Sequence, residues 1–186
     1  MTLKMNEGSK AFQICKAMAK YWGFEISEEK AKELAHKKNE IFRGENKAKI
    51  YREIPQIIAV AKQHNAKIGL VTGTSLKNLQ VVLPAEIYNS FDEIVTDKDT
   101  SRGKPFPDPY LRATEKLNVP PDQCIVIENA PMGIDSAKAA GTFCVALMTT
   151  LSREHLQKAD VIYRNHGELL ENITGLFEGL NSDRLG

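Results

Sequence analysis

The sequence lacks the features that mark membrane, secreted and nucleic-acid-binding proteins. It has no apolar run long enough to span a bilayer, and residues 1–10 are polar and mixed in charge, unlike a secretory signal. Its 25 lysines and arginines are nearly balanced by 24 acidic residues, so a net charge of +1 gives no electrostatic reason to bind nucleic acid or an anionic membrane. We therefore expect a cytoplasmic protein with no nucleic-acid or membrane partner.

Cysteine is also scarce. Cys15, Cys124 and Cys144 are widely spaced, odd in number and never part of a CxxC pair, which argues against a disulfide framework or a structural zinc site. Cys124 and Cys144 lie in apolar runs, so we expect small buried core residues in a reducing compartment. The 186 residues are 42% hydrophobic and 26% charged, an ordinary globular composition that suffices for one domain with a small insertion.

The pattern of residues changes near residue 50. Before that point, apolar spacing predicts a helix over 11–21, and Ser27 as an N-cap predicts a second helix through about Phe42, ended by Gly44. Two charged helices in a hairpin resemble a small lid more than a complete domain. We therefore assign residues 1–48 to a helical cap remnant.

Beyond residue 50, short apolar runs alternate with helical stretches. Runs of strand length between helices indicate βαβ units and a parallel sheet. We predict an α/β fold with a three-layer Rossmann-like parallel sheet over residues 49–180, followed by a flexible tail at 181–186. The predicted strands are 67–72, 93–96, 124–127, 143–147 and 161–163, and the predicted helices are 53–64, 76–83, 107–117, 132–140, 153–157 and 167–177.

Ligands of an open parallel sheet bind beyond the carboxyl ends of its strands. Three clusters follow predicted strands and should converge on one crevice: residues 72–75 (TGTS), 97–104 (DKDTSRGK) and 128–131 (ENAP). In the first, Gly73 lets backbone N–H groups approach an oxyanion, the next helix directs its positive end there, and Thr72 can donate to a phosphoryl oxygen. The same residues are equally ordinary turn and N-cap chemistry.

The other two clusters supply charge. Lys104 lies between Gly103 and Pro105 on a stiff, non-helical segment and could place an ammonium on a phosphate, although a lone lysine is usually a solvated surface residue. Glu128 ends a buried strand, where a carboxylate would suit Mg²⁺ or would simply cap or pair at the strand end.

In order and spacing, VTGTS, GKPFPDPY and VIENAPMGIDSAKAAG resemble motifs two, three and four of the haloacid dehalogenase superfamily, in its β-phosphoglucomutase-like branch. The resemblance covers about residues 50–165. It implies a hydrolase that acts on a small phosphorylated metabolite, such as a sugar phosphate, through an aspartyl phosphate, with Mg²⁺ as cofactor.

The resemblance also implies roles for single residues. Thr72 would bind the transferring phosphoryl group, and Lys104 would neutralise its charge. Glu128 and Asn129 would lie near Mg²⁺. Gly73, Thr74 and Lys10 would contact the substrate, and Lys10 would reach a distal phosphate from the cap.

One family motif has no counterpart. The first motif is a buried strand that ends in DxDxT, with a nucleophilic first aspartate and an acid–base second one, but no aspartate precedes Asp92. The run 94–100 (IVTDKDT) imitates it, yet lies between motifs two and three, in a stretch that is a polar loop in the family. Since the first strand is central in this fold, we expect unpaired edges near 67–71 and 124–127. The neighbouring strands could close up, a strand from another chain or self-association could fill the gap, or the chain could be poorly stable.

Asn129 is a second departure, because many relatives carry a metal-ligating aspartate there. Hard cations need several oxygen ligands, so we expect weak or no specific Mg²⁺ binding by this chain. Three interpretations stay open: a truncated phosphatase or phosphomutase that is inactive or very weak alone, a non-catalytic phosphate- or anion-binding relative, and a structural partner that associates through its sheet edges. The sequence does not name the substrate.

Overall fold

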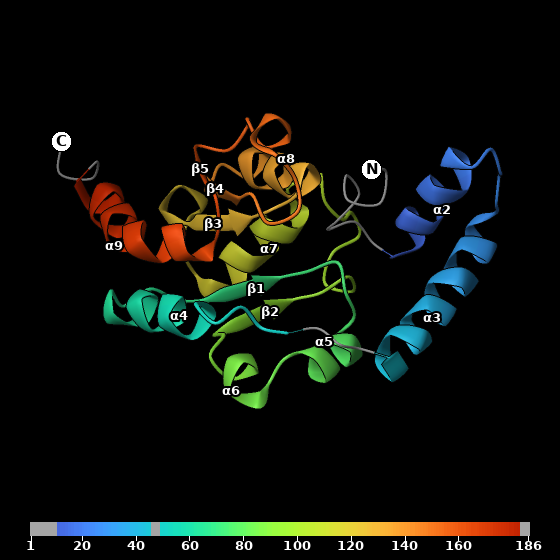
Figure 1. The fold of residues 1–186 in the computed structure, drawn as a ribbon, viewed down its shortest axis with the longest axis horizontal. Coiled ribbons are helices and arrows are strands. Elements are labelled where there is room, and N and C mark those ends of the chain that lie inside the picture. The colour runs from blue at the N-terminus through green and yellow to red at the C-terminus, as the bar shows by residue number, and fades with distance from the viewer. Residues whose placement is uncertain (1–10, 46–48, 183–186) are drawn as a thin grey trace.

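The structure is a computed structural model that describes residues 11–45 and 49–182. All of its strands pair in parallel and are interleaved with helices, so the predicted α/β class is confirmed (Figure 1). The helices are α2 (Ala11–Tyr21), α3 (Glu28–Glu45), α4 (Ile54–Gln63), α5 (Leu76–Val82), α6 (Ala85–Tyr88), α7 (Asp108–Leu117), α8 (Pro131–Ala139) and α9 (His166–Ser182). The strands are β1 (Gly69–Val71), β2 (Glu93–Val95), β3 (Ile125–Glu128), β4 (Phe143–Leu147) and β5 (Val161–Tyr163), and short 3-10 helices span Pro121–Gln123 and Arg153–His155.

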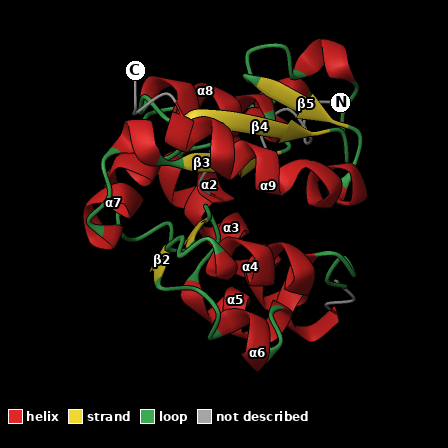
Figure 2. Cartoon of the chain, turned by 90° about the vertical axis from the view of Figure 1, so that its left-hand side faces the viewer, coloured by secondary structure: helices red, strands yellow, loops and turns green. Residues whose placement is uncertain are grey.

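The strands form two separate sheets. β1 pairs with β2, and β3, β4 and β5 form a second sheet with β4 in the middle. Within residues 11–45 and 49–182 no strand lies between β1 and β3, so each of these strands has one edge without a strand partner. In Figure 2 the region of β4 and β5 lies above, and α5 and α6 lie below.

Alternation along β4 builds the two layers around the larger sheet. Cys144 and Ala146 belong to a core with Tyr110 and Ile134, whereas Val145 and Leu147 belong to a core with α4 and α9. Successive side chains of a strand point to opposite faces, so helices cover β4 on both sides. This burial on both faces explains why the run FCVAL has no polar position.

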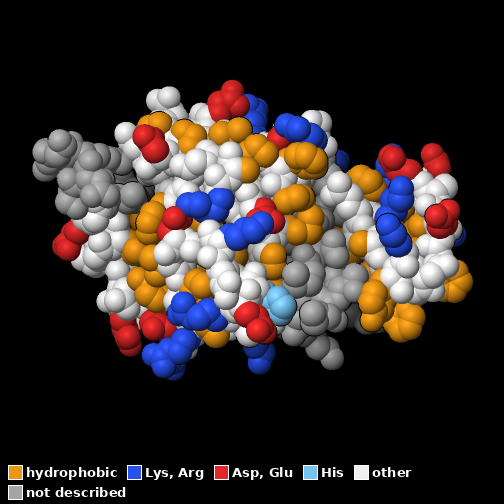
Figure 3. Space-filling model, turned by 90° about the horizontal axis from the view of Figure 1, so that it is seen from above, with side chains coloured by type: hydrophobic (Ala, Val, Ile, Leu, Met, Phe, Trp, Pro, Cys, Tyr) orange, Lys and Arg blue, Asp and Glu red, His pale blue; other side chains and the backbone are white. Residues whose placement is uncertain are grey.

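The small helical hairpin also forms as predicted. α2 packs against α3, and the Ser27 hydroxyl oxygen accepts a hydrogen bond from the Lys30 backbone N–H at 3.1 Å, which caps α3. The prediction that Gly44 ends this helix is wrong, because α3 continues to Glu45. On the face in Figure 3, hydrophobic side chains are interspersed with basic and acidic ones, at the end that holds α2 and α3 as well as over the rest of the face. None of the described helices is both long and apolar enough to cross a membrane.

Three local predictions need correction. Residues 85–88 form a further helix after Pro84, which the pattern of apolar residues did not indicate. α9 continues through Ser182 and so includes the first two residues predicted as a tail. Cys144 is fully buried, but Cys15 and Cys124 are only half-buried, so the prediction of a buried core residue is wrong for Cys124.

Candidate active site

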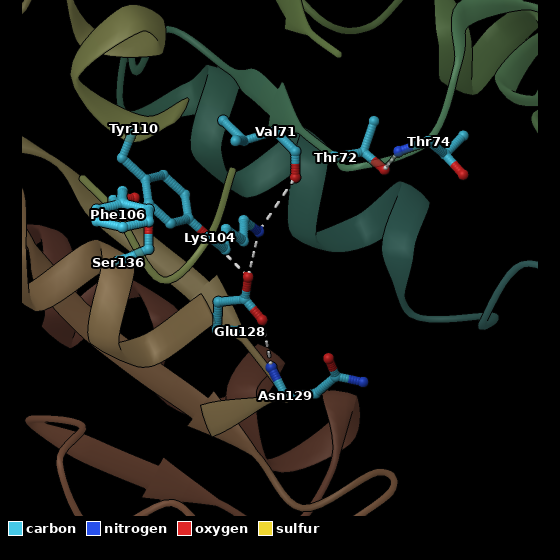
Figure 4. Close-up of polar contacts among 9 residues, drawn as sticks. All are labelled: Val71, Thr72, Thr74, Lys104, Phe106, Tyr110, Glu128, Asn129 and Ser136. Atoms are coloured by element: carbon cyan, nitrogen blue, oxygen red, sulfur yellow. Dashed lines mark hydrogen bonds and ion pairs between the residues drawn. The ribbon is translucent and has the colours of Figure 1, made fainter. Parts of the chain in front are cut away.

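A buried ion pair lies at the carboxyl ends of β1 and β3. The side chains of Lys104 and Glu128 are 5% and 9% exposed, and the lysine Nζ donates to the glutamate Oε1. The same Nζ lies 3.4 Å from the carbonyl oxygen of Val71. Lys104 therefore joins the last residue of β1 to the last residue of β3, as Figure 4 shows.

The Glu128 carboxylate has a partner on each oxygen. The Tyr110 hydroxyl donates to Oε1 at 2.7 Å, and the Asn129 backbone N–H donates to Oε2 at 3.0 Å. Burial by itself raises the pKa of Glu128, but the charge of Lys104 and these hydrogen bonds outweigh it and hold the pKa below its ordinary value. Burial and the Glu128 charge raise the pKa of Tyr110 well above its ordinary value. The site therefore holds an ionised carboxylate beside a neutral phenol at neutral pH.

Glycine is required at position 133 by this carboxylate. A Cβ built on Gly133 would lie 2.1 Å from the Glu128 carboxyl carbon, far inside van der Waals contact. Because Lys104 and Tyr110 both donate to this carboxylate, it cannot easily move away. The Ser136 hydroxyl, also on α8, donates to the Phe106 carbonyl oxygen at 2.6 Å and fixes the loop that carries Lys104.

Thr72 lies at the same edge of the sheet. Its N–H donates to the Val95 carbonyl oxygen at 2.9 Å, and its hydroxyl oxygen accepts from the Thr74 N–H at 3.1 Å. Ser75 then caps α5 by accepting from the Asn78 N–H at 3.4 Å. The turn and N-cap interpretation of this cluster thus applies, and the side chain of Thr72 also lines the cavity described next.

The three predicted clusters meet at one cavity of about 880 Å³. Five predicted site residues line it: Thr72, Gly73, Lys104, Glu128 and Asn129. Thr74 does not line it, and Lys10 is outside the described residues. Tyr110 also lines the cavity; its position in the GKPFPDPY motif was the only sequence signal for it.

The run 94–100 (IVTDKDT), which imitates the first motif, has a structural role. One Asp99 carboxylate oxygen accepts from both the N–H and the hydroxyl of Thr96, at 2.7 and 2.8 Å. The backbone hydrogen bond from Thr96 lowers the pKa of Asp99, and Asp99 does not line the cavity. These contacts close the loop after β2, as expected for a polar loop.

The described residues do not fit a Mg²⁺ centre by themselves. Both oxygens of Glu128 already accept hydrogen bonds, and it is the only acidic side chain among the described residues that line the cavity. The Asn129 amide nitrogen donates to the Thr149 hydroxyl oxygen at 3.1 Å. No group of three histidine, cysteine, aspartate or glutamate side chains in the described ranges could hold a metal. A hard cation here would need further oxygen ligands.

Comparison with known proteins identifies the class. Residues 7–147 match the haloacid dehalogenase-like hydrolases, and the chain belongs to that family. It is 50% identical over 78 residues to validoxylamine A 7′-phosphate phosphatase of Streptomyces hygroscopicus subsp. limoneus, and the aligned segment covers 42% of this chain and 37% of that protein. It is 32% identical over 116 residues to β-phosphoglucomutase of Bacillus subtilis, and this segment covers 62% of this chain and 50% of that protein. The chain therefore spans half or less of these two relatives.

Solved structures agree with this assignment. β-Phosphoglucomutase from Clostridium difficile superposes with a TM-score of 0.79 at 25% identity, covering 92% of this chain and 78% of that one. A haloacid dehalogenase hydrolase of family IA, variant 3, from Entamoeba histolytica gives a TM-score of 0.78 at 26% identity, covering 95% and 82%. The predicted resemblance to the β-phosphoglucomutase-like branch is confirmed by these relatives and neighbours.

Proposed function

We propose that this chain carries the phosphate-binding part of a phosphatase or phosphomutase that acts on a small phosphorylated metabolite, such as a sugar phosphate. The observation that carries the proposal is the buried ammonium of Lys104, held at the strand ends beside Thr72. Family membership supports the reaction class, and the names of two relatives, a phosphatase and a phosphoglucomutase, support a phosphorylated sugar-like substrate.

The residues divide the work of binding a phosphoryl group. An ammonium has three donors, and Lys104 uses one on Glu128 and one on the Val71 carbonyl oxygen, which leaves one for a phosphoryl oxygen. The Thr72 hydroxyl would donate a second hydrogen bond. Glu128 positions Lys104 rather than touching substrate. Positioning and charge neutralisation are the main contributions of protein side chains to phosphoryl transfer.

Turnover needs more than these residues supply. The resemblance implies an aspartate that attacks phosphorus, whereas the described residues that line the cavity include no aspartate. We propose that the nucleophile, and the extra oxygen ligands that Mg²⁺ would need, belong to a segment outside the described residues. The chain assayed by itself would then bind phosphate without hydrolysing a phosphate ester, or would hydrolyse it very weakly.

A non-catalytic phosphate-binding relative is the second candidate. It is favoured by the fact that the two residues expected near Mg²⁺ are both engaged elsewhere, Glu128 with Lys104 and Asn129 with Thr149. In such a protein the crevice at Lys104 and Thr72 would bind an anion, and no chemical step would follow.

Calorimetric titration with inorganic phosphate tests the shared binding step. We expect saturable binding that is lost in Thr72→Val with Lys104→Met, and unchanged binding in Lys116→Met. Lys116 is a matched control, because it is also partly buried and paired with a glutamate, Glu93, at 3.1 Å, but does not line the cavity. Since Lys104→Met could destabilise the fold, Thr72→Val alone, which keeps the ion pair, should still weaken binding.

Hydrolysis of p-nitrophenyl phosphate with Mg²⁺ tests the inactivity of the chain. We expect no turnover above the uncatalysed rate. Turnover that disappears in Lys104→Met and persists in Lys116→Met would show that the chain has its own nucleophile.

In the calorimetric titration, equal phosphate affinity in wild type and Thr72→Val would refute the proposed binding site.

A further inference from the structure

The ammonium of Lys104 has three different contacts, although a lysine side chain is flexible in general. Its Nζ donates to Glu128 Oε1 and lies 3.4 Å from the Val71 carbonyl oxygen. The third contact is with Tyr110, because Nζ lies over the tyrosine ring at 4.7 Å from its centroid. A cation within about 6 Å of a ring centroid is attracted to the ring face, and more strongly where water is excluded. Since the Lys104 side chain is only 5% exposed, the ring contact helps to keep the ammonium in place.

Tyr110 also contacts the other partner of the ion pair. Its hydroxyl donates to Glu128 Oε1 at 2.7 Å, and the same oxygen accepts from Lys104. A hydrogen bond to an ionised carboxylate is stronger than one between neutral groups. Rotation of the carboxylate would break the hydroxyl contact, and movement of the ammonium would break the ring contact. One side chain therefore restrains both charges.

Tyr110 is itself fixed by the core. It is 6% exposed and belongs to the core that contains Val126, Ile134 and Cys144. It lies in the first turn of α7, where its backbone N–H donates to the Pro107 carbonyl oxygen at 3.0 Å. Side chains in a close-packed core keep a defined rotamer. The core of the larger sheet can thus fix, through Tyr110, the position of the cation at the strand ends.

A purely structural role for Tyr110 is the alternative, because a buried tyrosine hydroxyl usually finds some hydrogen-bond partner. That role accounts for the buried ring but not for the contacts with two charged side chains that line the cavity. In Figure 4 the Tyr110 ring and Thr72 lie on opposite sides of the Lys104 ammonium. The side of the ammonium away from the ring is therefore the side of Thr72, where the phosphoryl group is proposed to bind.

We propose that Tyr110 is a positioning residue of the phosphate site, whose ring and hydroxyl together hold Lys104 and Glu128 so that one ammonium donor stays directed at a phosphoryl oxygen. This inference rests on the phosphate binding proposed above and adds a residue to it. Without the ring, the ammonium would be free to turn. Without the hydroxyl, Glu128 Oε1 would lose one of its two donors and would attract the ammonium more strongly, away from the phosphoryl group.

Two substitutions separate the contributions of the ring and the hydroxyl. Tyr110→Phe removes the hydroxyl and keeps the packed ring, whereas Tyr110→Leu removes both contacts. Tyr163→Phe is the matched control, because Tyr163 also packs against a core but does not line the cavity. Circular dichroism and the melting temperature check that each variant folds. If Tyr110→Leu does not fold, Tyr110→Phe still decides the question, because it keeps the shape of the core.

NMR of the Lys104 side chain without phosphate measures the positioning directly. In the wild type we expect a low mobility of the ε-methylene group and an upfield shift of its protons, which a ring face causes in groups that lie over it. Tyr110→Phe should keep the upfield shift and raise the mobility, measured as a lower order parameter. Tyr110→Leu should remove the shift and raise the mobility further, and Tyr163→Phe should change neither.

Calorimetric titration with inorganic phosphate then relates the positioning to binding. Tyr110→Leu should bind phosphate about tenfold more weakly than the wild type, because it loses a cation–π contact with a desolvated ammonium. Tyr110→Phe should bind about threefold more weakly, because it loses one hydrogen bond. Tyr163→Phe should bind phosphate as the wild type does.

Three results would overturn the proposal. These are a Lys104 signal that is the same in the wild type and both Tyr110 variants, an unchanged phosphate affinity in folded Tyr110→Phe and Tyr110→Leu, and an equal loss of affinity in Tyr163→Phe. A wild type that binds no phosphate would instead refute the proposed function. The Lys104 signal would then still show whether Tyr110 holds the ammonium, so the two failures are distinguishable.

Discussion

The two sheets of this chain are built from similar apolar runs but are buried to different degrees. In β4, Cys144, Val145 and Ala146 are 0% exposed, whereas none of the three residues of β1 is buried. β4 has a strand on each side and a packed core on each face, while β1 pairs with β2 alone and lines the cavity. The comparison teaches that the burial of a parallel strand depends on its neighbours as much as on its own composition.

The largest expected difference between the sheets is in local stability. Amides of β4 should exchange only through near-global unfolding, whereas those of Gly69–Val71 that are not hydrogen bonded to β2 should exchange through small local openings, so the opening free energies should differ by several kcal/mol. Exchange measured by NMR at pH 7 checks this. Equal protection in β1 and β4 would show that the two sheets do not differ in this way.

Breaking the ion pair tests the link between the sheets. Lys104→Met leaves the buried Glu128 charge without its cation, and removing one partner of a buried pair costs about 3–5 kcal/mol. We expect a loss of this size in the free energy of unfolding, measured by urea denaturation. A loss below about 1 kcal/mol would mean that the hydrogen bonds from Tyr110 and Asn129 suffice to stabilise the carboxylate.

Truncation of a leucine on each side should differ in the same sense. Leu156 is 0% exposed in the core with Val126 and Ile134, so Leu156→Ala should cost about 2–5 kcal/mol. Leu76, on α5 after β1, is 44% exposed, so Leu76→Ala should change stability by no more than about 0.5 kcal/mol. Thermal and urea denaturation compare both with wild type. A larger cost for Leu76→Ala would place a packed core on the β1 side.

The smallest expected effect is on the acid limb of the stability curve. The pKa of Glu128 is below its ordinary value, so the unfolded state binds more protons, and the stabilisation is present above that ordinary value and is lost as the pH falls through the lower folded pKa. Glu128→Gln should therefore flatten the acid limb by at most about one proton, about 1.4 kcal/mol per pH unit.

The carboxylate of Asp160 allows the same test in the larger sheet, because it accepts a hydrogen bond from the Cys144 N–H of β4. Although its partial burial raises the pKa of Asp160, hydrogen bonds from Lys138 and the Cys144 N–H lower it overall. Asp160→Asn should likewise flatten the acid limb, as measured by urea denaturation between pH 3 and 7. If only Asp160→Asn does so, the acid sensitivity belongs to the larger sheet and not to the junction at Glu128.

Much of the local structure could be predicted from the pattern of residues. The helix at Ala11–Tyr21 and the strand at Phe143–Leu147 have the predicted bounds, because a one-sided apolar stripe and a bounded apolar run are signals carried by adjacent residues. The Lys104 and Glu128 positions followed from a general rule, since polar residues at the carboxyl ends of parallel strands converge. The missed helix Ala85–Tyr88 is only four residues long and carries no repeat of apolar spacing.

Contacts between distant residues could not be predicted in this way. That Tyr110 donates to Glu128, that Asn129 turns to Thr149 and that Gly133 must lack a side chain all depend on how α7, α8 and β3 pack together. By itself, the sequence determined the α/β class, the family and the residues at the strand ends, because these are local patterns. Only the tertiary structure decided that Lys104 pairs with Glu128 and that β1 and β3 line one cavity without pairing, because packing sets which buried charges and strand edges meet.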